Sequence, residues 1–292
     1  MYLQKLSIVN FKNYTDAELK FSEKINCFVG NNGAGKTNLL DAIYYLSFCK
    51  SFINPVDSQN IHDNDPFFVI NGDFGIDDKT ENVYCGLKRN QRKQFKLNKK
   101  EYSRFADHIG LFPLVMISPF DTNLIYDGSE ERRKFIDTVI SQYNKNYLNI
   151  LINYNKVLLQ RNTLLKQMAE KNFFDRLSLD IWNEQIIEYG NVIHSIRKNF
   201  TEEFSPVFKS YYEYITENKE TIELKYNSQL NEADFSELLE KSLEKDRATE
   251  YTHTGIHKDD LELLISGNQL KKFGSQGQQK SFVIALKLAQ FE

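Results

Sequence analysis

A single stretch decides the fold of this chain: Gly30-Asn31-Asn32-Gly33-Ala34-Gly35-Lys36-Thr37. It satisfies the pattern Gly-x-x-x-x-Gly-Lys-[Ser/Thr] at every fixed position. The apolar run 25–29 before it predicts a strand, and apolar residues between Leu39 and Leu46 recur after it at helical spacing. Strand, glycine-rich loop and helix in this order favour a phosphate-binding loop (P-loop) over a glycine-rich turn that matches by chance.

The chemistry of the P-loop predicts the ligand. Glycines let backbone N–H groups turn inward around a phosphate, and the following helix adds partial positive charge at its N-terminus. We expect the Lys36 ammonium to reach the β- and γ-phosphates, and the Thr37 hydroxyl to take one position on a Mg²⁺ ion. The expected cofactors are therefore ATP and Mg²⁺, bound by residues 30–37, with Thr37 as the metal ligand.

Composition sets the broad class of the protein. The 292 residues are 41% hydrophobic and 13% aromatic, enough for a sizeable core, and the net charge of -3 favours neither nucleic acid nor membrane as a whole. Three cysteines stand far apart, without zinc-ligand spacing, which is typical of a reducing compartment. No apolar run approaches the length of a membrane span, so we expect a soluble, cytoplasmic protein.

Hydrophobic periodicity predicts the organisation of the chain. Helical stripes over 151–168 and 179–200 predict an antiparallel hairpin joined across 170–176, although two ordinary amphipathic helices fit equally well. Ser129 is the expected N-cap of the helix before them. Further helices are expected at 234–248 and from Gly277 onward. Strands are predicted at 2–10, 17–21, 67–76, 82–88, 92–97, 114–117, 221–226 and 261–265.

A second motif lies near the other end of the chain, in the segment Phe273-Gly274-Ser275-Gln276-Gly277-Gln278-Gln279-Lys280. A hydroxyl and free N–H groups at the start of a helix make a second anion site. The segment resembles the signature motif of ABC-type ATPases, whose DNA-repair and chromosome-maintenance branch also shares Asn31-Asn32-Gly33. This resemblance implies that Ser275, Gly277 and Gln278 contact ATP held by the P-loop of a second copy, in an ATP-dependent homodimer.

Landmarks along nearly the whole chain resemble the RecF family of bacterial DNA replication and repair proteins. They are Asn10–Tyr14, Gly33–Ile43, Lys50–Phe52, Ser118-Pro119 with Asp121, Gly128, Arg132–Asp137, Gly255–Leu261 and Ser275–Lys280. The resemblance implies an ATP-dependent DNA-binding protein of replication and recombinational gap repair in the SOS response to DNA damage, acting with recombination mediator proteins. It also implies that Lys12 lies against the nucleotide; a solvated lysine is the alternative.

One departure from the family concerns hydrolysis. RecF-like proteins are weak ATPases, and their signature helix leads to a Walker B strand whose acids hold Mg²⁺. This chain ends at Ala289-Gln290-Phe291-Glu292, before any such strand. The sequence thus indicates a truncated form or a fragment. ATP binding is expected, no catalytic residue is named, and the occurrence of hydrolysis stays open.

The densest positive charge predicts where DNA binds. This basic strip runs from Lys88 to Arg104 and contains one acid, Glu101. Phosphate contacts require such charge, although lysines also protect exposed strand edges from pairing. DNA, whether single-stranded, duplex or a junction of the two, is the expected partner, and no membrane partner is expected. The predicted contacts are Lys88, Arg89, Arg92, Lys93, Lys96, Lys99 and Lys100.

These observations predict an α/β fold: a P-loop ABC-type ATPase lobe (1–127 and 251–292) with an inserted, mainly helical lobe (128–250). Three alternatives remain. A P-loop kinase acting on a small molecule gives no reason for the signature-like segment, and an ABC transporter subunit requires a membrane partner. A chromosome-maintenance ATPase has long coiled coils, for which this chain has no room.

Overall fold

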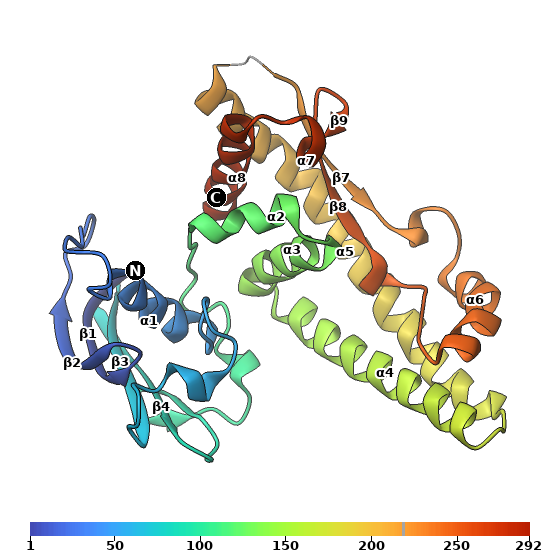
Figure 1. Ribbon diagram of the computed structural model, residues 1–292, viewed down its shortest axis with the longest axis horizontal. Helices are drawn as coiled ribbons and strands as arrows, with labels where there is room; N and C mark the ends of the chain where they lie inside the picture. The colour runs from blue at the N-terminus through green and yellow to red at the C-terminus, as the bar shows by residue number, and fades with distance from the viewer. Residues whose placement is uncertain (218–219) are drawn as a thin grey trace. The chain divides into compact units, whose positions relative to one another are not determined.

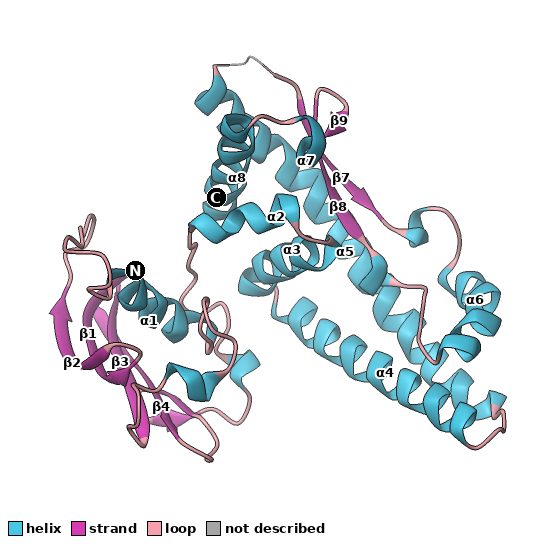
Figure 2. Cartoon of the chain, in the orientation of Figure 1, coloured by secondary structure: helices cyan, strands magenta, loops and turns pink. Residues whose placement is uncertain are grey.

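The structure of the chain is a computed structural model that describes residues 1–217 and 220–292. Packing divides it into two compact units, Met1–Leu114 and Val115–Glu292, each with its own hydrophobic core. The first unit is built around a sheet and the second is mainly helical (Figures 1 and 2). The predicted lobe boundaries, 1–127 with 251–292 around 128–250, remain a prediction. Within the described part of the chain, no helix is both long and apolar enough to cross a membrane.

The first unit is an antiparallel sheet with one long helix. Its strand order is β2-β1-β3-β4-β5-β6. The strands are β1 (Tyr2–Phe11), β2 (Tyr14–Lys20), β3 (Phe67–Ile76), β4 (Lys79–Lys88), β5 (Gln94–Leu97) and β6 (Lys100–Glu101). The helical segments are α1 (Lys36–Phe48) and the 3₁₀ turns η1 (Asp57–Asn60) and η2 (Phe105–Asp107).

Alternating burial holds this unit together. One cross-strand row joins four fully buried side chains, Ile8, Ile70, Cys85 and Phe95. Helix α1 contributes Tyr45, whose ring centroid lies 5.6 Å from that of Phe68 on β3. Because side chains on a strand alternate between faces, this row fixes the register of the sheet beneath α1.

The second unit surrounds a long helical hairpin. Its helices are α2 (Asn123–Tyr126), α3 (Ser129–Tyr143), α4 (Lys145–Glu170), α5 (Arg176–Thr216), α6 (Phe235–Thr249), α7 (Leu270–Phe273) and α8 (Gln276–Phe291). A small sheet is ordered β7-β8-β9, with bounds Ile222–Asn227, Asp260–Ile265 and Asn268–Gln269. The 3₁₀ turns are η3 (Pro119–Thr122), η4 (Gln229–Asn231) and η5 (Ile256–Lys258). Helices α4 and α5 pack along each other and form a hairpin (Figure 1).

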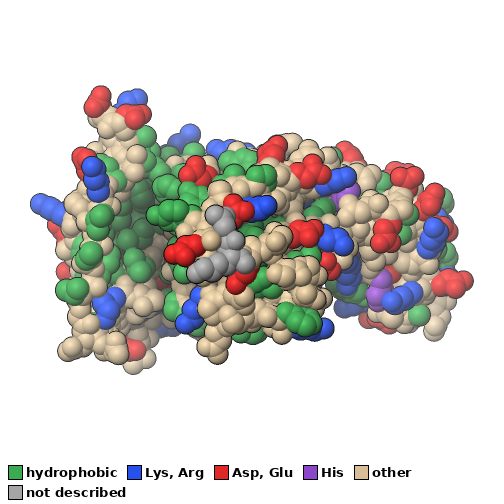
Figure 3. All heavy atoms as spheres, turned by 90° about the horizontal axis from the view of Figure 1, so that it is seen from above, with side chains coloured by type: hydrophobic (Ala, Val, Ile, Leu, Met, Phe, Trp, Pro, Cys, Tyr) green, Lys and Arg blue, Asp and Glu red, His purple; other side chains and the backbone are tan. Residues whose placement is uncertain are grey.

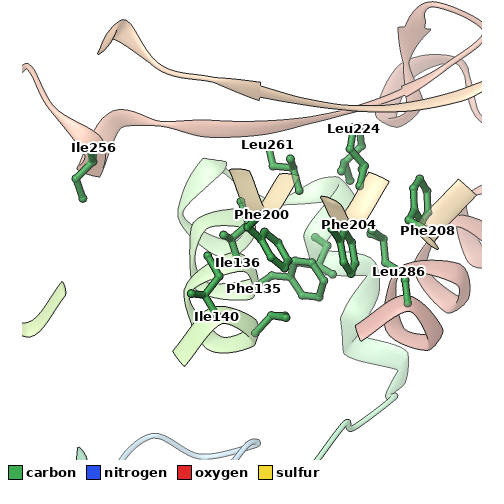
Figure 4. Packing of buried hydrophobic residues seen from close by; sticks show 14 of the residues in the cluster. Phe135, Ile136, Ile140, Phe200, Phe204, Phe208, Leu224, Ile256, Leu261 and Leu286 are labelled. Carbon is green, nitrogen blue, oxygen red and sulfur yellow. The ribbon is translucent and has the colours of Figure 1, made fainter. Parts of the chain in front are cut away.

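The core of the second unit is rich in aromatic rings (Figure 4). Phe200 and Phe204 of α5 stack with their centroids 5.0 Å apart, and Phe208 lies 4.7 Å from Phe282 of α8. Pro206 lies inside α5, between the buried Phe204 and Phe208. These contacts attach α8, which carries the signature-like segment at its start, to the long helix α5.

Two buried arginines join the hairpin to the rest of the second unit. Arg161 of α4 pairs with Asp246 of α6 at 2.8 Å, and both side chains are fully buried. Arg197 of α5 pairs with Asp137 at 2.9 Å and with Asp259 at 2.8 Å. Removing one member of such a pair leaves an uncompensated buried charge, so loss of either partner would destabilise the second unit.

Two predicted strands and one predicted cap are wrong. Residues 25–29 and 114–117 form no strand, because no described strand pairs with either segment, and Ile25 and Val29 are 81% and 91% exposed. Apolar content indicates a strand, but only a hydrogen-bonding neighbour makes one. The N-cap of α3 is Gly128 and not Ser129, whose hydroxyl instead accepts a hydrogen bond from Arg133 at 2.7 Å.

Candidate nucleotide and DNA sites

The P-loop has the backbone that its glycines predict. Gly33 and Gly35 have φ of +83° and +98°, in the left-handed region that favours glycine. A Cβ at Gly35 would lie 2.7 Å from the Asn13 amide nitrogen, so the position also requires glycine for space. The Lys36 ammonium donates to the carbonyl oxygens of Gly30 and Asn31, both at 2.8 Å. The lysine therefore lies across the loop, where a phosphate would replace two neutral acceptors with charged ones.

Three side chains that sequence reasoning did not assign to the site hold the P-loop from outside. The Tyr14 hydroxyl donates to the Gly35 carbonyl at 3.2 Å, and the Asn13 amide donates to the Gly33 carbonyl at 3.4 Å. Asn38 of α1 donates to the Asn13 side-chain oxygen at 2.7 Å. Asn13 and Tyr14 sit at the turn between β1 and β2, so this turn connects the sheet to the loop. Their role carries no sequence signal, since the contacts join residues about twenty positions apart.

Lys12 forms an ion pair with a buried carboxylate of α1. Its ammonium lies 2.6 Å from the Asp41 carboxylate, and the two side chains are 12% and 0% exposed. Asp41 also accepts from the Ser51 hydroxyl and the Phe52 N–H, both at 2.6 Å. Because a buried carboxylate needs a cation, Lys12 neutralises Asp41 in this structure. Lys12 is therefore not the solvated lysine of the alternative, and its contact with nucleotide stays a prediction.

The predicted Mg²⁺ site depends on Thr37 and on the phosphates of a bound nucleotide. Among the described residues, no group of three or more His, Cys, Asp or Glu side chains could hold a metal ion. Thr37 is exposed in the first turn of α1, next to Lys36, so its hydroxyl is accessible. One hydroxyl ligand suits an ion that binds mainly through phosphate and water oxygens, as Mg²⁺ does.

The signature-like segment forms a helix cap. Ser275 is the N-cap of α8: its hydroxyl oxygen accepts from the Gln278 N–H at 3.3 Å, and the Gln278 side chain accepts from the Ser275 N–H at 2.6 Å. This capping box leaves the N–H groups of Gln276 and Gly277 without a partner inside the helix. The Ser275 hydroxyl hydrogen is also free to donate. Ser275 and Gly277 are exposed, so this helix start can bind an anion.

Helix α8 is fastened at several points within the second unit. The Gln278 amide nitrogen donates to Glu220 at 2.6 Å, and Tyr126 of α2 hydrogen-bonds the Gln279 side chain. Farther along α8, the Lys287 ammonium lies 3.1 Å from the buried Asp121. These contacts fix the direction of the cap that presents Ser275. Sequence reasoning did not identify Glu220 or Tyr126 as supports of this segment.

The predicted DNA contacts of the basic strip, apart from Lys93, form two clusters. Lys88, Arg89 and Arg92 surround the β4–β5 turn, whereas Lys96, Lys99 and Lys100 lie at the β5–β6 end. All of these cations except Lys96 belong to the exposed class. Lys96 is half-buried, with its ammonium 5.3 Å from the centroid of the Tyr84 ring.

Among the predicted DNA contacts, Lys93 is ion-paired within the first unit, and its DNA contact stays a prediction. Its side chain is 9% exposed, and its ammonium donates to Asp57 at 2.6 Å, to the Cys49 carbonyl at 2.6 Å and to the Tyr45 hydroxyl at 3.0 Å. An ammonium has three hydrogens, so a contact with a DNA phosphate would require Lys93 to give up one of these bonds. Arg89 is partly committed, because it donates to the carbonyl oxygens of Asp63 and Asp65.

Charge on the face shown in Figure 3 is mixed. On the face shown in Figure 3, Lys and Arg side chains are interspersed with Asp and Glu side chains, in keeping with a net charge of -3. Mixed charge gives little general attraction for polyanions. Any DNA contact therefore depends on local groups, such as the two clusters beside β5.

Comparison with known proteins identifies relatives over the whole chain. A family model described as an AAA domain matches residues 5–288. The chain is 53% identical to the DNA replication and repair protein RecF of Flavobacterium johnsoniae, over 100% of this chain and 81% of the relative. It is 53% identical to the RecF protein of Bacteroides thetaiotaomicron, over 100% of this chain and 79% of that relative.

Solved structures agree with these relatives. A structure of the recombination mediator protein RecF with ATP, in the RecFOR pathway, superimposes with a TM-score of 0.93 at 32% identity. That match covers 99% of this chain and 80% of the other. The Smc head domain of Pyrococcus yayanosii superimposes with a TM-score of 0.53 at 14% identity. That match covers 99% of this chain and 83% of the other, and at this identity it shows a likeness of fold alone. The predicted α/β P-loop ATPase fold with a helical insertion is confirmed by these matches.

Proposed function

The chain belongs to the RecF family of DNA replication and repair proteins, and from this premise we propose that it binds ATP in its P-loop and closes on DNA as an ATP-dependent homodimer. The observation that carries the proposal is the position of Lys36, held by two loop carbonyl oxygens beside the start of α1. Residues 30–37 would cradle the β- and γ-phosphates with their N–H groups. The relatives give no support to a small-molecule kinase.

Mg²⁺ completes the proposed nucleotide site. When bound with ATP, the ion would neutralise phosphate charge, and Thr37 would supply its hydroxyl as a ligand from this chain. The described residues support binding and positioning; no residue is assigned to catalysis, so hydrolysis forms no part of the proposal.

Dimerisation follows from the second anion site. The exposed cap at Ser275 and Gly277 is proposed to bind the γ-phosphate of ATP held by the P-loop of a second copy. Nucleotide would then link the two copies, so ATP would stabilise the dimer by mass action. A head-to-head pair, each copy giving one P-loop and one signature-like segment, satisfies both sites at once.

DNA and protein partners complete the proposal. The clusters beside β5 are proposed to contact DNA phosphates, without reading base sequence. A relative is described as a recombination mediator protein in the RecFOR pathway, and we propose that this chain works with mediator proteins in gap repair. The three free cysteines suit the reducing cytoplasm, where we place the protein.

Replacing Lys36 by Ala tests the nucleotide site. The variant loses a cation that contacts phosphates, and we expect affinity for a fluorescent ATP analogue to fall by at least about tenfold. Lys36 donates to two exposed loop carbonyl oxygens, so circular dichroism should show an unchanged fold. Lys50→Ala, in the segment after α1, serves as a control for the loss of one positive charge. Unchanged affinity in a folded Lys36→Ala protein contradicts the P-loop assignment.

A further inference from the structure

The side chain of Gln278 joins the signature-like segment to a residue outside it. The two ends of its amide have different partners: the oxygen accepts the Ser275 N–H at 2.6 Å, and the nitrogen donates to a Glu220 carboxylate oxygen at 2.6 Å. A carboxylate can only accept hydrogen bonds, so Glu220 determines which end of the amide faces Ser275. An amide turned the other way would point its nitrogen at the Ser275 N–H, and the capping box would break.

Glu220 is itself held by the core. Its second carboxylate oxygen accepts from the Tyr212 hydroxyl at 2.5 Å. Tyr212 is fully buried near the end of α5, and its ring centroid lies 5.9 Å from that of Phe282 on α8. Burial, and then the bond to Glu220, raise the pKa of this hydroxyl, so Tyr212 remains a donor at neutral pH. The carboxylate is thus fixed against both α5 and α8.

This arrangement decides which groups of the cap can bind a ligand. The capping box occupies the N–H groups of Ser275 and Gln278, while the Ser275 hydroxyl hydrogen and the N–H groups of Gln276 and Gly277 stay available. Resting on the proposed function, we propose that Glu220 is a positioning residue, which orients Gln278 so that the signature-like segment presents these donors to the ATP of a second copy. Glu220 itself contacts no nucleotide in this proposal.

A simple capping role makes a different prediction, and Gln278→Glu separates the two. Glutamate at this third helical position completes a capping box as well as glutamine does, and its charge suits a helix N-terminus. If the segment needs only a cap, the variant dimerises normally. If Glu220 orients the side chain, the new carboxylate faces a like charge and has no hydrogen to donate. ATP-dependent dimerisation should then weaken on the order of tenfold.

The exchanged pair Glu220→Gln with Gln278→Glu provides the rescue. The new amide at 220 can donate to the carboxylate at 278 and still accept from the Tyr212 hydroxyl. The second oxygen at 278 can accept the Ser275 N–H. We expect the exchanged pair to dimerise within about threefold of the unaltered protein, and Glu220→Ala to be weaker on the order of tenfold.

The experiment is sedimentation velocity with a non-hydrolysable ATP analogue, performed on the unaltered protein, both single variants and the exchanged pair. Binding of the fluorescent analogue by the monomer should be equal in all of them, since the P-loop is unchanged. Normal dimerisation of Glu220→Ala or Gln278→Glu, or no rescue by the exchanged pair, overturns the positioning role alone. No dimerisation of the unaltered protein, despite ATP binding, overturns the proposed dimer and this role with it.

Discussion

At the scale of single residues, His257 shows how burial sets protonation. Its Nε2 lies 3.0 Å from the Thr252 carbonyl oxygen, which can only accept, so Nε2 carries the hydrogen. Its Nδ1 lies 2.8 Å from the Tyr154 hydroxyl and accepts from it. Both nitrogens are satisfied in the neutral ring, and burial lowers the pKa of His257 from 6.5 to about 4.

This lowered pKa predicts acid sensitivity of the second unit. Between pH about 4 and 6.5 the unfolded chain binds a proton at His257 that the folded chain excludes. The free energy of unfolding therefore falls as pH drops through 6.5, and the loss from this group is complete near pH 4. At pH 5 the protonation of His257 in the unfolded chain lowers the free energy of unfolding by about 2 kcal/mol. His257→Gln can make both hydrogen bonds without titrating, so its stability should fall less between pH 7 and pH 5.

Urea unfolding followed by Trp182 fluorescence measures this difference. Trp182 is the single tryptophan of the chain and lies in α5, so it reports on the second unit. Equal loss of stability by the two proteins between pH 7 and pH 5 would show that His257 is protonated in the folded state.

At the scale of elements, the two clusters beside β5 predict how DNA binding responds to salt. Replacing Lys96, Lys99 and Lys100 by Gln removes up to three phosphate contacts, each of which contributes about 0.9 to the slope of log K against log salt on duplex DNA. We expect weaker binding to unrelated duplexes by similar factors, and a slope reduced by roughly 2 to 3. A salt titration by fluorescence anisotropy measures both.

Matched variants define the control for that titration. Three exposed lysines of the hairpin region, changed to Gln, alter the net charge by the same amount; they are Lys156, Lys166 and Lys171. If the hairpin variant and the β5–β6 variant weaken DNA binding equally, then the net charge of the protein determines the affinity and the basic strip makes no specific contact. Lost solubility with an unchanged slope would show that the lysines protect a strand edge.

Lys93 should behave differently from its neighbours. Lys93→Gln removes the partner of Asp57 and a donor to the Cys49 carbonyl, so we expect it to destabilise the first unit by about 2 kcal/mol. Burial raises the pKa of the Cys49 thiol to about 12, which keeps it unreactive while the unit is folded. Faster labelling of Cys49 and Cys85 by a thiol reagent in mild urea would report the destabilisation. Unchanged labelling of the cysteines, together with weaker DNA binding, would show that Lys93 contacts DNA.

Sequence reasoning succeeded where one short pattern determines the outcome. Alternation over 2–10 and 17–21 predicted β1 and most of β2, and the spacing of Leu151 to Phe200 predicted the helices α4 and α5, because each pattern is local. It failed for residues 25–29, where strand formation depends on a partner that no described strand provides. It also could not predict the support that Glu220 gives to Gln278, since that contact spans 58 positions and leaves no periodic trace.

At the scale of the whole molecule, the two anion sites predict an oligomer that depends on nucleotide. Ser275→Arg places a long side chain where the γ-phosphate of a second copy is proposed to lie. We expect monomer affinity for ATP to be unchanged and the ATP-dependent dimer to be absent in sedimentation velocity. Phe291→Arg, at the other end of α8 and 80% exposed, is the control and should dimerise normally. Equal dimerisation of Ser275→Arg and the unaltered protein contradicts the role assigned to the signature-like segment.

The proline inside α5 has a mechanical consequence. The helix has 41 residues, a rod of roughly 60 Å, and a proline removes one hydrogen bond of the rod and weakens it against bending. Here packing supports the helix at the proline, because Phe204 and Phe208, on either side of Pro206, are both buried in the core. Thermal bending of α5 at Pro206 should therefore be small. Helix α8, which begins at the signature-like segment, thus packs against a part of α5 that the buried rings keep straight despite the proline.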